Sequence, residues 1–163
     1  MRKPAHGSHP AYDAVYRSPV APLGITMQGS SLVAMDWLLE DVPVRVIPSQ
    51  AATQVVRILD QYFTDFRSTS HITFNLTGTR FQQRVWRALQ TIPPGEVMTY
   101  GQLARRLKTC AQAIGQACRT NPIAVLIPCH RVVAAQGLGG YMGEQRQTQI
   151  KKWLLRHEGV TWL

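Results

Sequence analysis

The sequence predicts two packed units, an α/β unit over residues 1–77 and a mostly helical unit over residues 78–163. Three observations predict this fold class. The chain has 163 residues, which suits one domain or two small ones. Strand-like segments come first in the sequence, and helix-like spacing of apolar residues follows them. Apolar residues make up 45% of the chain, enough to bury a core, so a disordered protein is excluded.

The N-terminal unit is expected to hold two β segments and one helix after a loose tail. Residues 12–27 and 31–39 have strand-like composition and are separated by turn-forming residues. From Ser49 onward the apolar residues recur at helical spacing, which predicts an amphipathic helix. Its apolar stripe consists of Val55, Val56, Leu59, Tyr62, Phe63 and Phe66. The polar residues 67–78 should form a connection with one short strand.

The C-terminal unit is expected to be helical. Thr79 can cap a helix that carries apolar residues as far as Ile92, and Pro93-Pro94-Gly95 stops it. A capping box, Thr99-x-x-Gln102, opens a helix over residues 100–107. A three-residue turn then leads to a helix over residues 111–120. This pair suggests a DNA-binding helix-turn-helix, although any pair of antiparallel helices gives the same pattern.

The excess of positive charge lies entirely in the C-terminal half. The net charge is +9, and residues 1–77 carry as many acidic as basic groups. Residues 78–163 carry twelve basic groups against Glu96, Glu144 and Glu158. This asymmetry favours a polyanionic partner, most simply nucleic acid, over an ordinary basic surface.

The outward face of the 111–120 helix is small and polar. It would present Gln112, Ala113, Gly115, Gln116 and Arg119. Such a face can approach a confined surface such as the DNA minor groove, which is about 6 Å wide. Packing against a neighbouring helix is an equally good interpretation.

No stretch approaches the roughly 20 consecutive apolar residues of a membrane span, and the N-terminus lacks an apolar signal region. The three cysteines are too few and oddly numbered for a disulfide framework, and their spacing does not suit structural zinc. We therefore expect a soluble protein of a reducing compartment, the cytoplasm or, in a eukaryote, the nucleus, with no metal.

The apolar run IAVLIPCHRVV introduces a thiol, an imidazole and a guanidinium together. Cys129 lies between Pro128 and His130, the side chain best suited to move a proton near neutral pH. In an extended segment Cys129 and His130 would point to opposite faces, so a bridging water or a local bend is required. Glu158, at the end of a predicted helix, is a candidate carboxylate behind His130. Cys110 and Cys118 are by default small apolar residues.

Four segments together resemble the O6-alkylguanine-DNA alkyltransferases. They are Asn121-Pro122, Ile127-Pro-Cys-His-Arg-Val132, Tyr100-Gly-Gln-Leu-Ala104 and Trp153-Leu-Leu-Arg-His-Glu-Gly159. The resemblance covers roughly residues 81–159, and Pro-Cys-His-Arg-Val is its specific signature. It implies a ribonuclease-H-like N-terminal domain with no catalytic role of its own. It also implies a single-turnover methylated-DNA–[protein]-cysteine S-methyltransferase that repairs DNA without a cofactor.

The resemblance also implies a role for each site residue. Cys129 would accept the alkyl group from O6-alkylguanine flipped out of duplex DNA, His130 would activate it through a water, and Glu158 would hold the imidazole. Tyr100 would donate a hydrogen bond to the flipped base, and Asn121 would brace the loop that carries Cys129. The expected pocket residues are Val132, Tyr141, Met142 and Cys118. The expected DNA contacts are Gln112, Ala113, Gly115, Arg119, Tyr100 and Arg131.

The sequence departs from the family pattern near the DNA. Gln112 stands where the family usually has an intercalating arginine. Glu144 replaces the second glycine of Tyr-x-Gly-Gly, which places an acidic group at the rim of the expected pocket. The expected partner is double-stranded DNA bound through the minor groove by a monomer. O4-alkylthymine as a second substrate and cooperative binding along DNA stay open. Two alternative functions remain: a Cys–His hydrolase with an acyl intermediate on Cys129, and a DNA-binding protein that recognises alkylated bases without repairing them.

Overall fold

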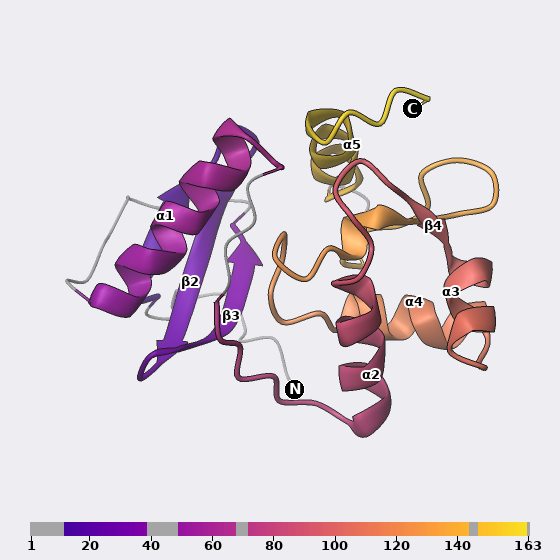
Figure 1. Cartoon of the computed structure of the whole chain (residues 1–163), viewed down its shortest axis with the longest axis horizontal. Coiled ribbons are helices and arrows are strands. Elements are labelled where there is room, and N and C mark those ends of the chain that lie inside the picture. Colours follow the sequence, from indigo (N-terminus) through magenta and orange to yellow (C-terminus); the bar gives the residue numbers. More distant parts are fainter. Residues whose placement is uncertain (1–11, 39–48, 68–71, 144–146, 163) are drawn as a thin grey trace.

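The computed structural model describes residues 12–38, 49–67, 72–143 and 147–162. The N-terminal part is an antiparallel sheet in the order β1 (Ala14–Arg17), β2 (Pro22–Gln28) and β3 (Ser31–Trp37). Figure 1 shows α1 (Gln50–Thr64) lying along one face of this sheet, with the helical C-terminal part beside it. The predicted fold class, an α/β part followed by a helical part, is confirmed.

The helix α1 begins where the sequence predicts. The Ser49 side chain caps it by accepting a hydrogen bond from the backbone N–H of Ala52. Its buried residues are Ala52, Val55, Ile58, Leu59 and Tyr62. The helix ends at Thr64, because Asp65 adopts an extended conformation. Phe66 therefore lies beyond the helix, contrary to the expected stripe.

The C-terminal part begins with α2 (Arg80–Leu89), which Thr79 and Gln82 cap reciprocally. The helix stops before Ile92, whose N–H donates to the carbonyl of Leu89 in a turn. The prediction that Ile92 belongs to the helix is wrong in this detail. Ile92 is nevertheless buried in the core.

The expected helix-turn-helix is formed by α3 (Tyr100–Arg106) and α4 (Ala111–Arg119). Thr99 and Gln102 form the predicted capping box at the start of α3. A short parallel ladder, which the sequence did not predict, pairs β4 (Met98–Thr99) with β5 (Val132–Val133). The chain closes with α5 (Thr148–His157).

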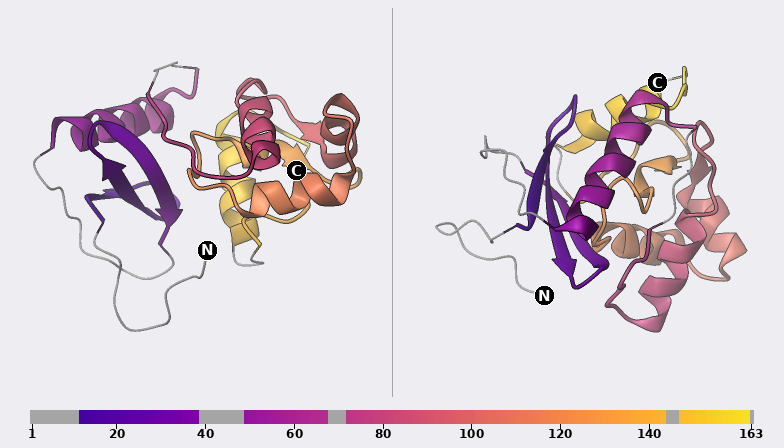
Figure 2. Two further views of the ribbon diagram at one scale, coloured as in Figure 1. Left: turned by 90° about the horizontal axis from the view of Figure 1, so that it is seen from below. Right: turned by 60° about the vertical axis from the view of Figure 1, so that its left-hand side comes forward.

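The two parts share one continuous apolar core. The segment before Cys129 is attached to the N-terminal sheet, because the N–H of Met35 donates to Pro122 and Met35 accepts from the N–H of Ala124. Figure 2 shows this segment of the C-terminal part next to the sheet. The division at residues 77 and 78 stays a prediction. None of the helices in the described ranges is long and apolar enough to cross a membrane.

Candidate active site

Asn121 holds the loop that leads to Cys129. Its Oδ1 accepts from the N–H of Ile123 at 3.0 Å, and its Nδ2 donates to the carbonyl of Ile127 at 2.8 Å. The same Nδ2 lies 3.1 Å from the Cys129 sulfur. Val125 has a φ of 68°, an unfavourable angle for a β-branched residue, so the loop is held in a tight shape. Asn121 therefore holds the loop backbone and contacts the Cys129 sulfur with the same side chain.

Cys129, His130 and Arg131 form a single 3₁₀ turn rather than an extended segment. The N–H of Arg131 donates to the carbonyl of Pro128 at 3.0 Å. The local bend that the sequence analysis required is therefore present. The turn directs both His130 and Arg131 into the protein, where both are buried.

Cys129 is buried, with only 2% of the residue exposed. Burial raises its pKa to about 11, and this rise is limited by the Asn121 hydrogen bond and by the positive charge of Lys151. The sulfur also lies 3.6 Å from the thioether of Met142. The resting thiol is thus protonated near neutral pH and needs a base before it can act as a nucleophile.

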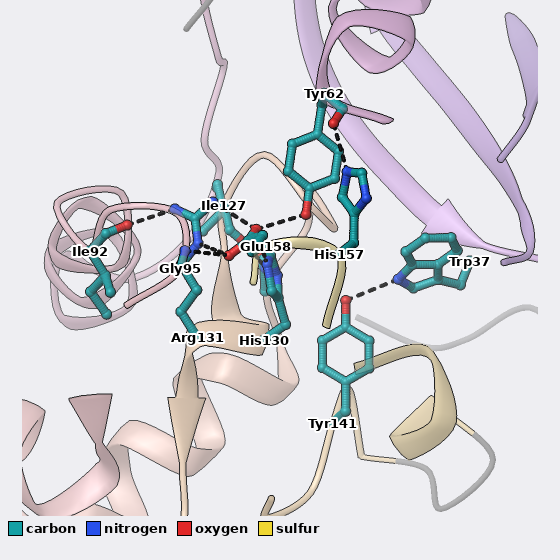
Figure 3. A network of polar contacts seen from close by, with 11 residues as sticks. Trp37, Tyr62, Ile92, Gly95, Ile127, His130, Arg131, Tyr141, His157 and Glu158 are labelled. Carbon is teal, nitrogen blue, oxygen red and sulfur yellow. Dashed lines mark hydrogen bonds and ion pairs between the residues drawn. The ribbon is translucent and has the colours of Figure 1, made fainter. Parts of the chain in front are cut away.

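A buried polar network lies behind the thiol (Figure 3). Glu158 Oε1 contacts His130 Nε2 at 2.8 Å and accepts from Arg131 Nη2 at 2.9 Å. Glu158 Oε2 accepts from Arg131 Nε at 2.9 Å and from the N–H of Gly95 at 3.3 Å. Arg131 Nη1 donates to the carbonyl of Ile92 at 2.6 Å. Glu158, just past α5, thus joins the turn after α2 to the Cys129 turn.

Gly95 is required at this contact. Its φ is 83°, and a Cβ there would lie 2.8 Å from the carbonyl oxygen of Glu158. Only glycine combines this backbone angle with this close approach. The Pro93-Pro94-Gly95 stop therefore also places the N–H that binds Glu158.

His130 is arranged as a neutral base. Burial lowers its pKa below the usual value, although Glu158 opposes this shift. Because Nε2 faces a carboxylate, Nε2 carries the proton and Nδ1 is left as the acceptor. Nδ1 is buried and has no hydrogen-bond partner among the described residues. It is free to receive a proton.

Acid is expected to destabilise the protein through Glu158. Burial alone would raise its pKa, but His130 and Arg131 outweigh burial and hold the pKa of this carboxyl well below its usual value of 4.5. The unfolded chain then binds more protons than the folded protein. The stabilisation is complete above the usual value and is lost as the pH falls through the folded value.

The free energy of unfolding in urea, measured from about pH 7 down to about pH 3, tests this. It should fall with pH more steeply for the wild type than for Glu158→Gln. Equal slopes for the two proteins would contradict this role of Glu158.

A pocket of about 440 Å³ opens above the thiol, in the size range of ligand sites. It lies between the outer face of α4 and the segment after β5. Its lining includes Cys129, Tyr100, Cys118, Tyr141, Met142, Gln112, Gly115 and Arg119. The pocket therefore joins the Cys129 thiol to the helix that is expected to face DNA.

Comparison with known proteins identifies the family. The profile described as "6-O-methylguanine DNA methyltransferase, DNA binding domain" matches residues 80–160. The methylated-DNA–protein-cysteine methyltransferase of Mycobacterium leprae is 39% identical over 151 residues, covering 88% of this chain and 92% of the relative. This chain belongs to the 6-O-methylguanine DNA methyltransferase family.

Solved structures agree with this assignment to the methyltransferase family. Mycobacterium tuberculosis OGT in complex with DNA has a TM-score of 0.76 at 37% identity, covering 88% of this chain and 90% of that one. The O6-methylguanine-DNA methyltransferase of Pyrococcus kodakaraensis has a TM-score of 0.64 at 26% identity, covering 90% and 97%. The predicted family, fold and activity class are confirmed.

Two expectations about the methyltransferase site are corrected by the structure. Arg131 does not face DNA, because the residue is only 7% exposed and its guanidinium donates to Glu158 and to the carbonyl of Ile92. Val132 is not among the residues that line the pocket, and its side chain is buried in the core at β5. Glu144, expected at the pocket rim, lies outside the described residues. No group of histidine, cysteine or carboxylate side chains suited to a metal occurs in the described ranges.

Sequence reasoning missed Lys151, a fully buried residue of α5. Its Nζ donates to the carbonyls of Val132 at 2.6 Å and Gly140 at 2.8 Å, and lies 5.7 Å from the centre of the Tyr100 ring. Burial lowers its pKa to about 8. Lys151 thus fixes the pocket segment to β5. The sequence did contain a signal for this burial, because Lys151 lies among apolar residues of a predicted helix.

Two residues of the N-terminal part were also missed. The indole N–H of Trp37 donates to the Tyr141 hydroxyl at 3.0 Å, and the Tyr62 hydroxyl donates to Glu158 Oε1 at 2.7 Å (Figure 3). In the sequence both fit an apolar pattern. Only the packing of the two parts shows these contacts.

Proposed function

We propose that this chain removes an alkyl group from O6-alkylguanine in duplex DNA and transfers it to Cys129. The observation that carries this proposal is the placement of Cys129 at the floor of the pocket, with the His130–Glu158 pair behind it. The Cys129 sulfur would attack the alkyl carbon in line with the O6 oxygen. A carbon–sulfur bond forms, the carbon–O6 bond breaks, and guanine leaves with the electron pair.

The proton of the thiol would pass to His130. Nδ1 of His130 is the acceptor left by the contact between Nε2 and Glu158. A water molecule between the thiol and Nδ1 would carry the proton, as the bend at Cys129–Arg131 allows. Glu158 stays ionised and stabilises the imidazolium that forms.

Tyr100 would stabilise the departing guanine. Its ring lines the pocket, and its hydroxyl now donates weakly to the carbonyl of Gly140 at 3.3 Å. Burial raises the pKa of this hydroxyl above its usual value, so it keeps its proton and can donate it in a hydrogen bond. Turning from Gly140 to the base offsets the negative charge that guanine gains.

The product is a thioether, which is chemically inert, so each molecule should react once. The base must leave the stack first, at a cost of a few kcal/mol. The exposed face of α4, with Gln112 and Arg119 on the pocket rim, would approach the minor groove. We expect a protein with this activity to act on DNA in the cytoplasm of a bacterium or in the nucleus of a eukaryote, and to act as a monomer.

The mass of the protein tests this function. The chain is incubated with an oligonucleotide duplex that carries O6-methylguanine, and its peptides are weighed. The expected result is one methyl group on the peptide of Cys129. Tight binding without this gain would support a protein that recognises alkylated bases without repair. Repeated release of product from an ester, without binding, would support a Cys–His hydrolase.

Replacing Gln112 by arginine is expected to speed repair of duplex DNA several-fold. The amide of Gln112 is shorter than a guanidinium and uncharged, so it fills the gap left by the flipped base less well and attracts phosphates less. The rate of methyl transfer from a duplex oligonucleotide measures the effect. Gln54→Arg, which adds the same charge on the exposed side of α1, is the control. A Gln112→Arg rate equal to or below that of wild type would refute this explanation.

A further inference from the structure

Tyr62 crosses from the N-terminal part into the polar network behind the nucleophile. It lies in the last turns of α1, and its hydroxyl donates to Glu158 Oε1 at 2.7 Å (Figure 3). The same oxygen contacts His130 Nε2 at 2.8 Å. Tyr62 and His130, the proposed base for Cys129, therefore share the Oε1 atom of Glu158 as a hydrogen-bond partner.

The position of the Tyr62 hydroxyl is fixed from several sides. The residue is 7% exposed, and its ring meets the rings of Phe63 and His157 edge-on, with centres 5.0 and 5.4 Å apart. Its carbonyl oxygen lies 2.8 Å from His157 Nε2. Both the backbone and the ring of Tyr62 are thus bound to the end of α5, directly before Glu158.

The other donors to Glu158 come from the C-terminal part. Arg131 binds both oxygens, Gly95 binds Oε2, and His130 binds Oε1. Within the described residues, Tyr62 is the donor that the N-terminal part contributes. Burial and the adjacent carboxylate raise the pKa of its phenol well above the usual value, so it remains a donor throughout the physiological range.

We propose that Tyr62 is a positioning residue for alkyl transfer, which it supports by orienting Glu158 against His130. This role of Tyr62 rests on the proposed function. Besides His130 Nε2, two donors meet on Oε1, the Tyr62 hydroxyl and Arg131 Nη2, and together they define the direction in which Oε1 faces His130. That direction keeps the proton on Nε2 and leaves Nδ1 as the acceptor for the thiol proton. The N-terminal part thereby takes part in the chemistry, contrary to the expectation that it has no role in catalysis.

Tyr62→Phe tests the proposal, because it removes one oxygen and keeps the packed ring. The first-order rate constant for methyl transfer at saturating duplex should fall about tenfold, the size expected for losing one hydrogen bond to a charged group. The dissociation constant for the duplex should not change. Tyr16→Phe is the matched control, since the Tyr16 hydroxyl donates to the exposed Asp60 at 2.9 Å and Tyr16 also packs on Phe63. It should transfer at the wild-type rate.

Introducing Tyr62→Phe into a His130→Gln protein distinguishes a positioning role from general destabilisation. In a His130→Gln protein the base is already absent, so adding Tyr62→Phe should leave the residual rate unchanged. An unchanged rate for Tyr62→Phe alone, or the same tenfold loss in both backgrounds, would overturn the proposal.

A readout without alkylated DNA keeps the two proposals distinguishable. Iodoacetamide can reach Cys129 through the pocket, and the alkylation of its peptide is followed by mass. Tyr62→Phe should slow this reaction and Tyr16→Phe should not. If wild-type protein takes no methyl from DNA, the proposed function fails, and this measurement still decides the role of Tyr62: equal rates for wild type and Tyr62→Phe refute it.

Discussion

Cys129→Ser is expected to lower the rate of methyl transfer by at least about a thousandfold, the largest effect of any single substitution. A serine hydroxyl is a far weaker nucleophile than a thiolate, and the hydrogen bond from Asn121 Nδ2 at 3.1 Å would stabilise a sulfur anion. The substituted side chain fits the same space, so folding should survive. Methylation of the protein by a duplex containing O6-methylguanine measures the rate.

Cys110→Ser is the control for this prediction. Cys110 is exposed at the start of α4 and is not part of the pocket lining. It should retain full activity. Binding of the duplex should be unchanged in both variants, because neither alters the charge of α4, the helix proposed to face DNA. Transfer by Cys129→Ser at a rate near that of wild type would place the acceptor elsewhere.

Glu158→Gln is expected to affect both stability and activity. A neutral amide leaves the buried Arg131 guanidinium without its anion, and breaking a buried pair in this way costs about 3 kcal/mol of unfolding free energy. It also removes the anion that stabilises the His130 imidazolium, so methyl transfer should slow about a hundredfold. Denaturant unfolding and the single-turnover rate measure the two effects.

Asp60→Asn is the matched control, because Asp60 accepts a hydrogen bond from the Tyr16 hydroxyl at the surface. It should cost less than about 1 kcal/mol and leave the rate unchanged. Equal stabilities of Glu158→Gln and wild type would show that the buried carboxylate does not balance Arg131.

The sequence predicts the elements whose causes are local. Ser49, Thr79 and Thr99 each cap a helix as expected, because a cap is formed by side chains and N–H groups within one turn. A partner for Glu158 could also be predicted, because a carboxylate at a helix C-terminus is unfavourable unless a positively charged or hydrogen-bonding group offsets it.

Contacts between the two parts could not be predicted in this way. Tyr62 fits the apolar stripe of α1, and nothing in its spacing shows that its hydroxyl reaches Glu158, 96 positions later. Arg131 is one of the twelve basic groups of the C-terminal half, whose excess of positive charge favours contact with DNA. The 3₁₀ turn instead directs its side chain inward and buries its guanidinium. Two-residue strands such as β4 and β5 are too short to leave a periodic pattern.

The pairing of β4 with β5 joins the backbone next to Tyr100 to the backbone next to Cys129. Thr99 pairs with Val133 directly before Tyr100, and Met98 pairs with Val132 soon after Cys129. Tyr100, the proposed hydrogen-bond donor, begins α3 directly after β4, and Cys129, the proposed alkyl acceptor, lies in the turn just before β5. Main-chain bonds between the two strands therefore hold the backbones that carry both residues. Because this pairing is part of the fold, we expect the adjustment on DNA binding to fall mainly on the nucleic acid.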